Sequence, residues 1–244
     1  MTQIKRYRLK EDEWRLIDNF RKHKKQDTHN ENILVIGDLH CPFDLDSYLD
    51  FCLEASLKYD CTKFIQIGDV IDNHYSSYHE TDPDGLSGGD ELEMAISRLQ
   101  RYYKAFPQMT VILGNHDRMV ARQFKTAGIP KRWLRSYQEV LEVPNWEFTE
   151  RLVYNNIQFI HGEGGNAAKK CKDDMMNTVS GHYHTLGYTQ YFCGANFKVF
   201  GTQVGTGIDF DKYAFHYAKY GKKPIVGCVV IKDGKTPINL LMDL

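Results

Sequence analysis

The sequence lacks several features that would assign it to a familiar class. Its six cysteines include no C-x-x-C pair, so we expect neither a zinc finger nor a disulfide scaffold, and the thiols should be reduced. No apolar run approaches ~18 residues, which argues against a membrane span. The N-terminus carries no apolar core segment, which argues against a signal peptide. The resulting expectation is a cytoplasmic protein without a membrane partner.

The chain also lacks an excess of charge of either sign. Its 31 Lys and Arg residues nearly balance 32 Asp and Glu residues, and the net charge is −1. There is no global attraction for nucleic acids or membranes, so any basic surface must be local. With 244 residues and 42% hydrophobic content, the chain is typical of one large globular domain. We expect this single domain over residues 31–244, preceded by a helical appendage over residues 1–30.

The helical character of the appendage comes from residues 11–25. Trp14, Ile17 and Phe20 are spaced three residues apart, which places them on one helix face. The basic run Arg21–Lys25 follows. It is either a solvated helix end, where cations favour the helix dipole, or a contact for a phosphate backbone.

The rest of the chain changes character between its two halves. The first half alternates strands and helices, as in a largely parallel sheet, with strands expected at 33–37, 64–68 and 109–113 and helices at 45–59 and 89–105. The second half is rich in short strands, expected at 157–161, 177–180, 187–193, 197–204, 225–231 and 237–242. This pattern predicts two sheets packed face to face with helices outside. Residues 73–90 read as a long loop, and loops of that length are often functional.

Five short motifs occur in a fixed order, and four of them follow an apolar, β-branched run. They are Asp38-Leu39-His40, Gly68-Asp69-Val70-Ile71-Asp72, Gly114-Asn115-His116-Asp117, His161, and Gly181-His182-Tyr183-His184. Each of those four places a polar side chain where a buried strand ends. In open α/β sheets ligands bind at that edge.

The polar residues of the motifs are of the kinds that bind metal ions. Asp38, Asp69 and Asp72 offer carboxylates, His40, His161, His182 and His184 offer imidazoles, and Asn115 offers an amide oxygen. This mixture suits Mn²⁺, Fe, Zn²⁺, Co²⁺ or Ni²⁺, whereas Ca²⁺ takes oxygens only and structural zinc prefers thiolates. In an extended D-x-H segment both polar side chains point to the same face. A pair of ions about 3.5–4 Å apart is suited to phosphate-ester hydrolysis, and His116 could serve as general acid.

Together the motifs resemble those of the calcineurin-like metallophosphoesterase superfamily, in the small form found in bacteria and phages. The series D-x-H, G-D-x-x-D, G-N-H-D, H and G-H-x-H is complete over residues 38–184. The resemblance implies an αββα sandwich of two mixed β-sheets flanked by helices, with a dimetal site at the C-terminal edges of the strands. It implies one ligand set of Asp38, His40, Asp69 and His184, and a second of Asp69, Asn115, His161 and His182. Asp69 would bridge the ions, His116 would protonate the leaving group oriented by Asp117, and Asp72 would lie behind the ligands.

The function that this resemblance implies is hydrolysis of phosphate esters by in-line attack of a metal-bound hydroxide, with two divalent ions and Mn²⁺ as the first choice. We expect a phosphodiesterase or nuclease acting on nucleic acid or nucleotides. A phosphomonoesterase acting on proteins or small molecules is the alternative. A binding module that has lost catalysis is a third interpretation, although every motif position is retained.

Contacts to the substrate are harder to assign. Asn115 would hold phosphoryl oxygens, and Arg118 matches phosphate geometry. His74 and His79 follow the second motif and could line the pocket. The basic stretches Lys169–Lys172 and Lys219–Lys223 are either solvated surface or contacts to DNA or RNA. A homodimer and an ATPase partner stay open.

Overall fold

The structure is a computed structural model, and it describes residues 31–76, 86–212 and 222–243. The expected N-terminal helix lies outside the described residues. So do His79 and most of Lys219–Lys223.

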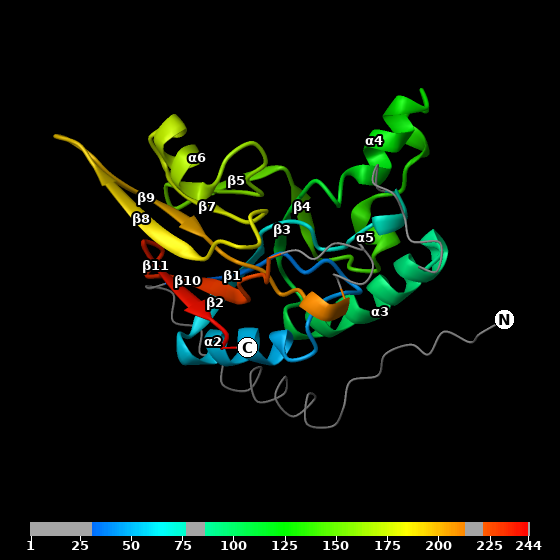
Figure 1. The fold of residues 1–244 in the computed structure, drawn as a ribbon, viewed down its shortest axis with the longest axis horizontal. Coiled ribbons are helices and arrows are strands. Elements are labelled where there is room, and N and C mark those ends of the chain that lie inside the picture. The colour runs from blue at the N-terminus through cyan, green and yellow to red at the C-terminus, as the bar shows by residue number, and fades with distance from the viewer. Residues whose placement is uncertain (1–30, 77–85, 213–221, 244) are drawn as a thin grey trace.

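Two β-sheets form the centre of the described chain (Figure 1). The six-stranded sheet has the order β11-β10-β1-β2-β3-β4, from β1 (Asn32–Ile36), β2 (Cys61–Gln66), β3 (Thr110–Ile112), β4 (Glu147–Thr149), β10 (Gly227–Lys232) and β11 (Thr236–Leu241). The five-stranded sheet has the order β5-β6-β7-β9-β8, from β5 (Arg151–Tyr154), β6 (Ile157–Ile160), β7 (Asn177–Ser180), β8 (Tyr188–Cys193) and β9 (Lys198–Gln203). Both sheets are mixed, because β10, β11, β5 and β8 pair antiparallel to their neighbours.

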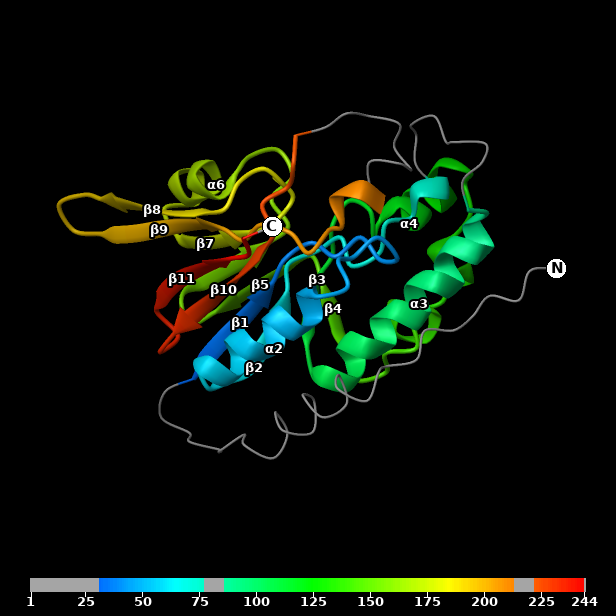
Figure 2. The same cartoon turned by 60° about the horizontal axis from the view of Figure 1, so that its bottom comes forward.

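The described helices are α2 (Tyr48–Lys58), α3 (Gly88–Ala105), α4 (Met119–Thr126), α5 (Tyr137–Val140) and α6 (Ala167–Asp174), with short 3₁₀ helices η1 (His74–Ser76) and η2 (Lys131–Trp133). Helices α2 and α3 lie outside the first sheet, and α6 lies outside the second (Figure 2). Helix α2 contacts β1, β2 and β10 of the first sheet, and α6 contacts β7 and β9 of the second. The expected sandwich of two mixed sheets flanked by helices is confirmed.

Strand β1 shows why the apolar runs of the sequence are continuous rather than alternating. Ile33 and Val35 belong to the apolar cluster between the two sheets, whereas Leu34 and Ile36 belong to the cluster beneath the helices. Successive strand residues point to opposite faces, so a strand covered on both sides needs apolar side chains at every position. All four residues are fully buried.

The structure differs from the expected layout in two respects. The sheets do not divide the chain into halves, because β10 pairs with β1 and so returns the C-terminal strands to the first sheet. The short strands β4 and β5 and the helices α4, α5 and α6 were not expected from the sequence. Each has at most eight residues, and segments so short carry little periodic signal.

The six cysteines all lie in the described residues, and none of them forms a disulfide. None of the helices within residues 31–76, 86–212 and 222–243 is long and apolar enough to span a membrane. The cytoplasmic location stays a prediction.

Candidate metal centre

The carboxyl ends of five strands bring the motifs together. Strands β1, β2 and β3 are parallel neighbours in one sheet, and β6 and β7 are parallel neighbours in the other. Each is followed within a few residues by a motif, including the fifth motif, which follows β7. Because parallel strands end at the same edge, residues between positions 38 and 184 meet there.

Three of the candidate ligands hold a backbone conformation that side-chain-bearing residues seldom adopt. The φ angles of His40, Asp69 and His182 are 47°, 52° and 71°, and such left-handed residues cluster at functional sites. The Asp69 carbonyl accepts hydrogen bonds from the amides of both Leu39 and His40, at 3.0 and 2.9 Å. The extended geometry expected for Asp38-Leu39-His40 is therefore not adopted, and a tight loop contact turns His40 toward the site instead.

Glycines in the motifs leave the space that the carboxylates and imidazoles occupy. A Cβ atom on Gly114 would overlap the Asp69 Oδ1 atom, and one on Gly181 would overlap the Asp38 Oδ1 atom. A Cβ on Gly68, whose φ is +113°, would overlap the His161 ring. These glycines are therefore needed because the candidate ligands pack directly against the backbone.

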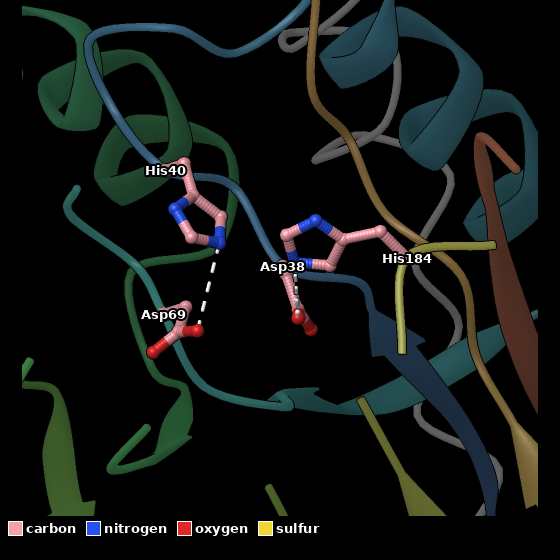
Figure 3. Close-up of side chains that lie close together, drawn as sticks. All are labelled: Asp38, His40, Asp69 and His184. Atoms are coloured by element: carbon pink, nitrogen blue, oxygen red, sulfur yellow. Dashed lines mark ion pairs between the residues drawn. The ribbon is translucent and has the colours of Figure 1, made fainter. Parts of the chain in front are cut away.

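The first candidate ligand set is made of Asp38, His40, Asp69 and His184, whose ligand atoms all lie within 4.8 Å of one another (Figure 3). The His40 Nε2 atom lies 3.5 Å from Asp69 Oδ2, and the His184 Nε2 atom lies 3.4 Å from Asp38 Oδ2. Asp38, His40 and Asp69 are buried, and His184 is half-buried. The four residues are those that the family resemblance implies for one metal ion.

The second candidate set shares Asp69 and adds His161 and His182. Three potential ligand atoms surround the His161 Nε2 atom: Asp69 Oδ2 at 3.0 Å, Asn115 Oδ1 at 3.1 Å and His182 Nδ1 at 3.2 Å. His182 and His184 are only two residues apart, yet they belong to different sets because His182 turns into the left-handed conformation.

Hydrogen bonds behind the imidazoles fix which ring nitrogen faces the site. The His161 Nδ1 atom donates to the Ile67 carbonyl at 3.1 Å, so its Nε2 atom is the ligand atom. The His40 Nδ1 atom donates to Asp72 Oδ1 at 2.6 Å, which turns the His40 Nε2 atom toward Asp69. Such contacts orient metal-binding histidines and raise their basicity.

In the metal-free chain, the pKa values of the candidate ligand histidines shift in opposite directions. Burial lowers the pKa of His40 well below its ordinary value, so His40 is neutral. Burial also acts to lower the pKa of His161, but the Asp69 carboxylate outweighs it and raises that pKa to about 9. Against the effect of burial, His161 in turn holds the pKa of Asp69 well below its usual range. A cation that binds here would take over the role that the His161 proton plays beside Asp69.

The donors fit a pair of divalent cations. Asp38 Oδ1 is buried and has no hydrogen-bond partner among the described residues, an arrangement that is costly unless a cation or water completes it. Both sets combine carboxylate oxygen with imidazole nitrogen and contain no thiolate, which suits the ions expected from the sequence.

The third motif supplies two residues with different contacts. The His116 Nδ1 atom is 2.5 Å from the Asp72 carbonyl, and its backbone N–H donates to Asp69 Oδ1 at 2.8 Å. The Asp117 carboxylate accepts instead from the amides of residues 69, 70, 71 and 114, at 2.8–3.3 Å. The sequence led us to expect that Asp117 orients His116. In the structure the Asp72 carbonyl contacts the His116 ring instead. Asp117 joins the loop of the second motif to the loop of the third.

The pKa values of these two residues shift for different reasons. Burial lowers the pKa of His116, but Asp69 and Asp72 outweigh it and leave the pKa above its ordinary value. Burial and the nearby Asp69 raise the pKa of Asp117 to about 6. At neutral pH Asp117 is therefore ionised, and its carboxylate can accept the four hydrogen bonds from backbone amides.

Two of the predicted substrate contacts, Arg118 and His74, differ in how exposed they are. Arg118 is about one-third exposed and forms an ion pair with Glu163, which the sequence did not single out. His74 is 5% exposed in η1, beneath α3. This burial leaves His74 little surface to offer a substrate, and we no longer propose it as a contact.

Glu91 of α3 was also missed. It accepts from the amides of His74 and Tyr75 at 2.8 and 3.3 Å and so anchors the loop behind Asp72. Its position in an ordinary amphipathic helix gave no signal for this role.

Replacing Asp72 with alanine should weaken metal binding and slow turnover together, each by about 10- to 100-fold, because the variant frees His40 and removes the charge beside His116. Metal titration followed by calorimetry and steady-state rates would measure both effects. The exposed Glu54→Ala variant in α2 is the control for loss of one carboxylate. An unchanged metal affinity would contradict the positioning role of Asp72.

Comparison with family models identifies the family of this chain. The family model "Calcineurin-like phosphoesterase" matches residues 31–196, more than half of the chain. The chain therefore belongs to the calcineurin-like phosphoesterase family. No curated protein matched it.

Solved structures that the chain resembles share little sequence with it. Vacuolar protein sorting 29 from Cryptosporidium parvum has 13% identity and a TM-score of 0.45, with 88% of this chain and 100% of that one covered. The phosphoesterase YfcE from E. coli has 13% identity and a TM-score of 0.43, with 82% and 87% covered. A putative diadenosine tetraphosphatase has 12% identity and a TM-score of 0.41, with 88% and 95% covered.

Proposed function

We propose that this chain is a dimetal-dependent phosphoesterase that hydrolyses phosphodiesters, with nucleic acids or nucleotides as its substrates. One observation carries the proposal. The Asp69 carboxylate belongs to both candidate ligand sets, and the backbone of His116 is hydrogen-bonded to that same carboxylate. A single side chain would thus hold two cations beside the candidate acid.

The residues that would hold the cations are the two sets already described. Asp38, His40, Asp69 and His184 would bind one ion, and Asp69, Asn115, His161 and His182 would bind the other. Divalent cations, Mn²⁺ being the one we propose, supply Lewis acidity to a phosphate and acidify water. The family relationship supports a dimetal centre and a phosphate-ester substrate.

The proton for the leaving oxygen would come from His116 Nε2. Because the Asp72 carbonyl accepts from Nδ1, that nitrogen keeps its hydrogen, and Nε2 carries a proton only in the imidazolium form. The raised pKa of His116 favours this form near neutral pH.

Orientation of the phosphate would fall to the neutral amide of Asn115, whose Oδ1 lies beside His161. The loops that carry these groups are held by the four hydrogen bonds that the Asp117 carboxylate accepts from backbone amides. Fixed donors and ligands reduce the reorganisation that hydrolysis requires.

Rates on two aryl esters test the proposal. With Mn²⁺, we expect faster turnover of bis(p-nitrophenyl) phosphate than of p-nitrophenyl phosphate, loss of both activities with a chelator, and recovery when Mn²⁺ is restored. Preference for the monoester would favour the phosphatase alternative. Absence of turnover by the metal-loaded chain would favour the binding module. The homodimer and the ATPase partner stay predictions from the sequence.

A further inference from the structure

A basic segment directly follows the third motif. Residues 118–135 contain six cations, Arg118, Arg122, Lys125, Lys131, Arg132 and Arg135, and no acidic residue. In a chain with a net charge of −1, such a run is a local concentration of positive charge. We call this segment, which comprises α4, η2 and their connection, the basic segment.

The basic segment lies at the surface on the opposite side of the molecule from the β8–β9 hairpin (Figure 1). All of its cations except Arg118 are exposed. Trp133 is 78% exposed and Ile129 is 41% exposed. An indole ring in water, flanked by Lys131, Arg132 and Arg135, has no packing role that would explain it.

Four of these cations form no ion pair among the described residues, although Arg135 lies close enough to Glu139 to act on that carboxylate. Arg118 pairs with Glu163. Lys125, Lys131, Arg132 and Arg135 form no ion pair with any residue in the described part of the chain. Their charge is therefore available for a partner.

A cavity of about 770 Å³ lies against the basic segment, and its size is within the usual range for ligand sites. All of the basic segment's cations except Arg132 line it. Apolar side chains also line it, among them Leu134, Tyr137 and Phe148, and the Tyr137 and Phe148 rings stack at 5.2 Å. Its five cations outnumber the two carboxylates in the lining, those of Asp117 and Glu150, so the cavity suits a ligand that combines a flat apolar group with negative charge.

The cavity adjoins the candidate metal centre through shared loops. Ile71, Asn73 and Asp117 line the cavity. The same loops contribute Asp69, Asp72 and His116 to the candidate metal centre. The Asn73 amide donates to the His116 carbonyl at 2.9 Å, which joins the two loops.

We propose that the basic segment and this cavity bind single-stranded nucleic acid. Guanidinium and ammonium groups would hold successive backbone phosphates, and the Trp133 indole would stack on an unpaired base. A base within a duplex offers no free face to the indole, so the exposed tryptophan favours a single strand. An acidic peptide would match the charge but would not need a flat exposed ring beside it.

This inference deepens the proposed function and rests on it for its link to catalysis. A strand held along the basic segment passes Arg118, the neighbour of Asp117, and so reaches the candidate metal centre. The substrate class is therefore a single-stranded polynucleotide rather than a small diester.

Fluorescence anisotropy of a labelled 20-nucleotide oligo-dT tests the binding. The full-length chain is titrated in chelator, so that no strand is cut, and again with Mn²⁺ in a His116→Ala background. We expect the single strand to bind at least tenfold more tightly than a duplex of the same length. Trp133→Ala should weaken binding by about 5- to 150-fold, the effect of losing one stacked base.

A triple variant separates charge from stacking. Lys131→Gln, Arg132→Gln and Arg135→Gln together should lower the salt dependence of binding, reducing the slope of log affinity against log salt by about 2–3. The matched control is Lys198→Gln, Lys232→Gln and Lys235→Gln, three exposed lysines outside the basic segment, and should change affinity by less than about twofold. Circular dichroism confirms that each variant folds.

Three outcomes would overturn the inference: equal affinity for single strand and duplex with no effect of Trp133→Ala, equal losses in the two triple variants, or equally tight binding of poly-glutamate. The inference and the proposed function can fail separately. Hydrolysis of bis(p-nitrophenyl) phosphate without Trp133-dependent binding would reject the inference alone. Trp133-dependent binding without hydrolysis of any ester would reject the proposed function alone.

Discussion

Asp69→Asn should abolish both metal binding and hydrolysis of phosphate esters. Asp69 is 1% exposed, and its Oδ2 atom lies 3.5 Å from His40 Nε2 and 3.0 Å from His161 Nε2. Asparagine keeps the shape but removes the charge that would hold two cations at once. Metal content per chain by mass spectrometry, together with the turnover of bis(p-nitrophenyl) phosphate, measures both effects.

The control for this variant is Asp60→Asn. Asp60 is exposed in the turn after α2, and its φ of 49° is one that asparagine tolerates. It should retain full metal content and full rate. Normal metal content or normal turnover in Asp69→Asn would refute the bridging role that we assign to Asp69. A melting temperature close to that of the wild type would show that any loss comes from the site and not from unfolding.

His116→Ala should keep the metals and yet slow turnover by ~10²–10⁴-fold. His116 is not in either metal set that contains Asp69, and its ring is held by Asp72. The loss should be greatest for esters with poor leaving groups, because these need a proton most. A series of aryl diesters whose leaving groups differ in pKa, with metal content measured in parallel, checks this.

The same variant has a pH signature. His116 can donate from Nε2 only as imidazolium, and Asp69 and Asp72 place its pKa above the ordinary value, although burial opposes them. For a poor leaving group, the wild-type rate should therefore fall as pH rises through that pKa, and His116→Ala should lack this fall. Loss of metal in the variant, or equal slowing for every leaving group, would contradict the role of proton donor.

The sequence predicted the two-sheet fold because its strands are covered on both faces. The runs before Asp38 and Asn115 are continuously apolar and the run before Asp69 is apolar except for Gln66, and the structure places them in β1, β3 and β2. The short edge strand β5 has an alternating exposed and half-buried pattern over four residues, too short to stand out from a loop. The return of β10 to β1 is a long-range pairing that no local pattern contains.

The candidate site was predictable as a set of residues but not as a geometry. Order and spacing named the ligands, and the structure brings Asp38, His40, Asp69 and His184 together as one group. The hydrogen bonds that orient these residues could not be predicted from the sequence. Whether Asp72 or Asp117 holds the His116 ring depends on how two loops cross, and the sequence does not encode that locally. The sequence analysis did not single out the basic segment, which became a candidate only through its exposed surface and adjoining cavity.

The crowding at Gly114 and Gly181 has an evolutionary consequence. One added methyl group at either position would collide with a carboxylate oxygen while leaving every charged and polar side chain of the centre in place. A member of this family can therefore be silenced by a substitution that preserves all of its acids, amides and imidazoles. Judging from sequence whether a relative is active requires attention to these two small residues as well as to the residues that would touch the ions.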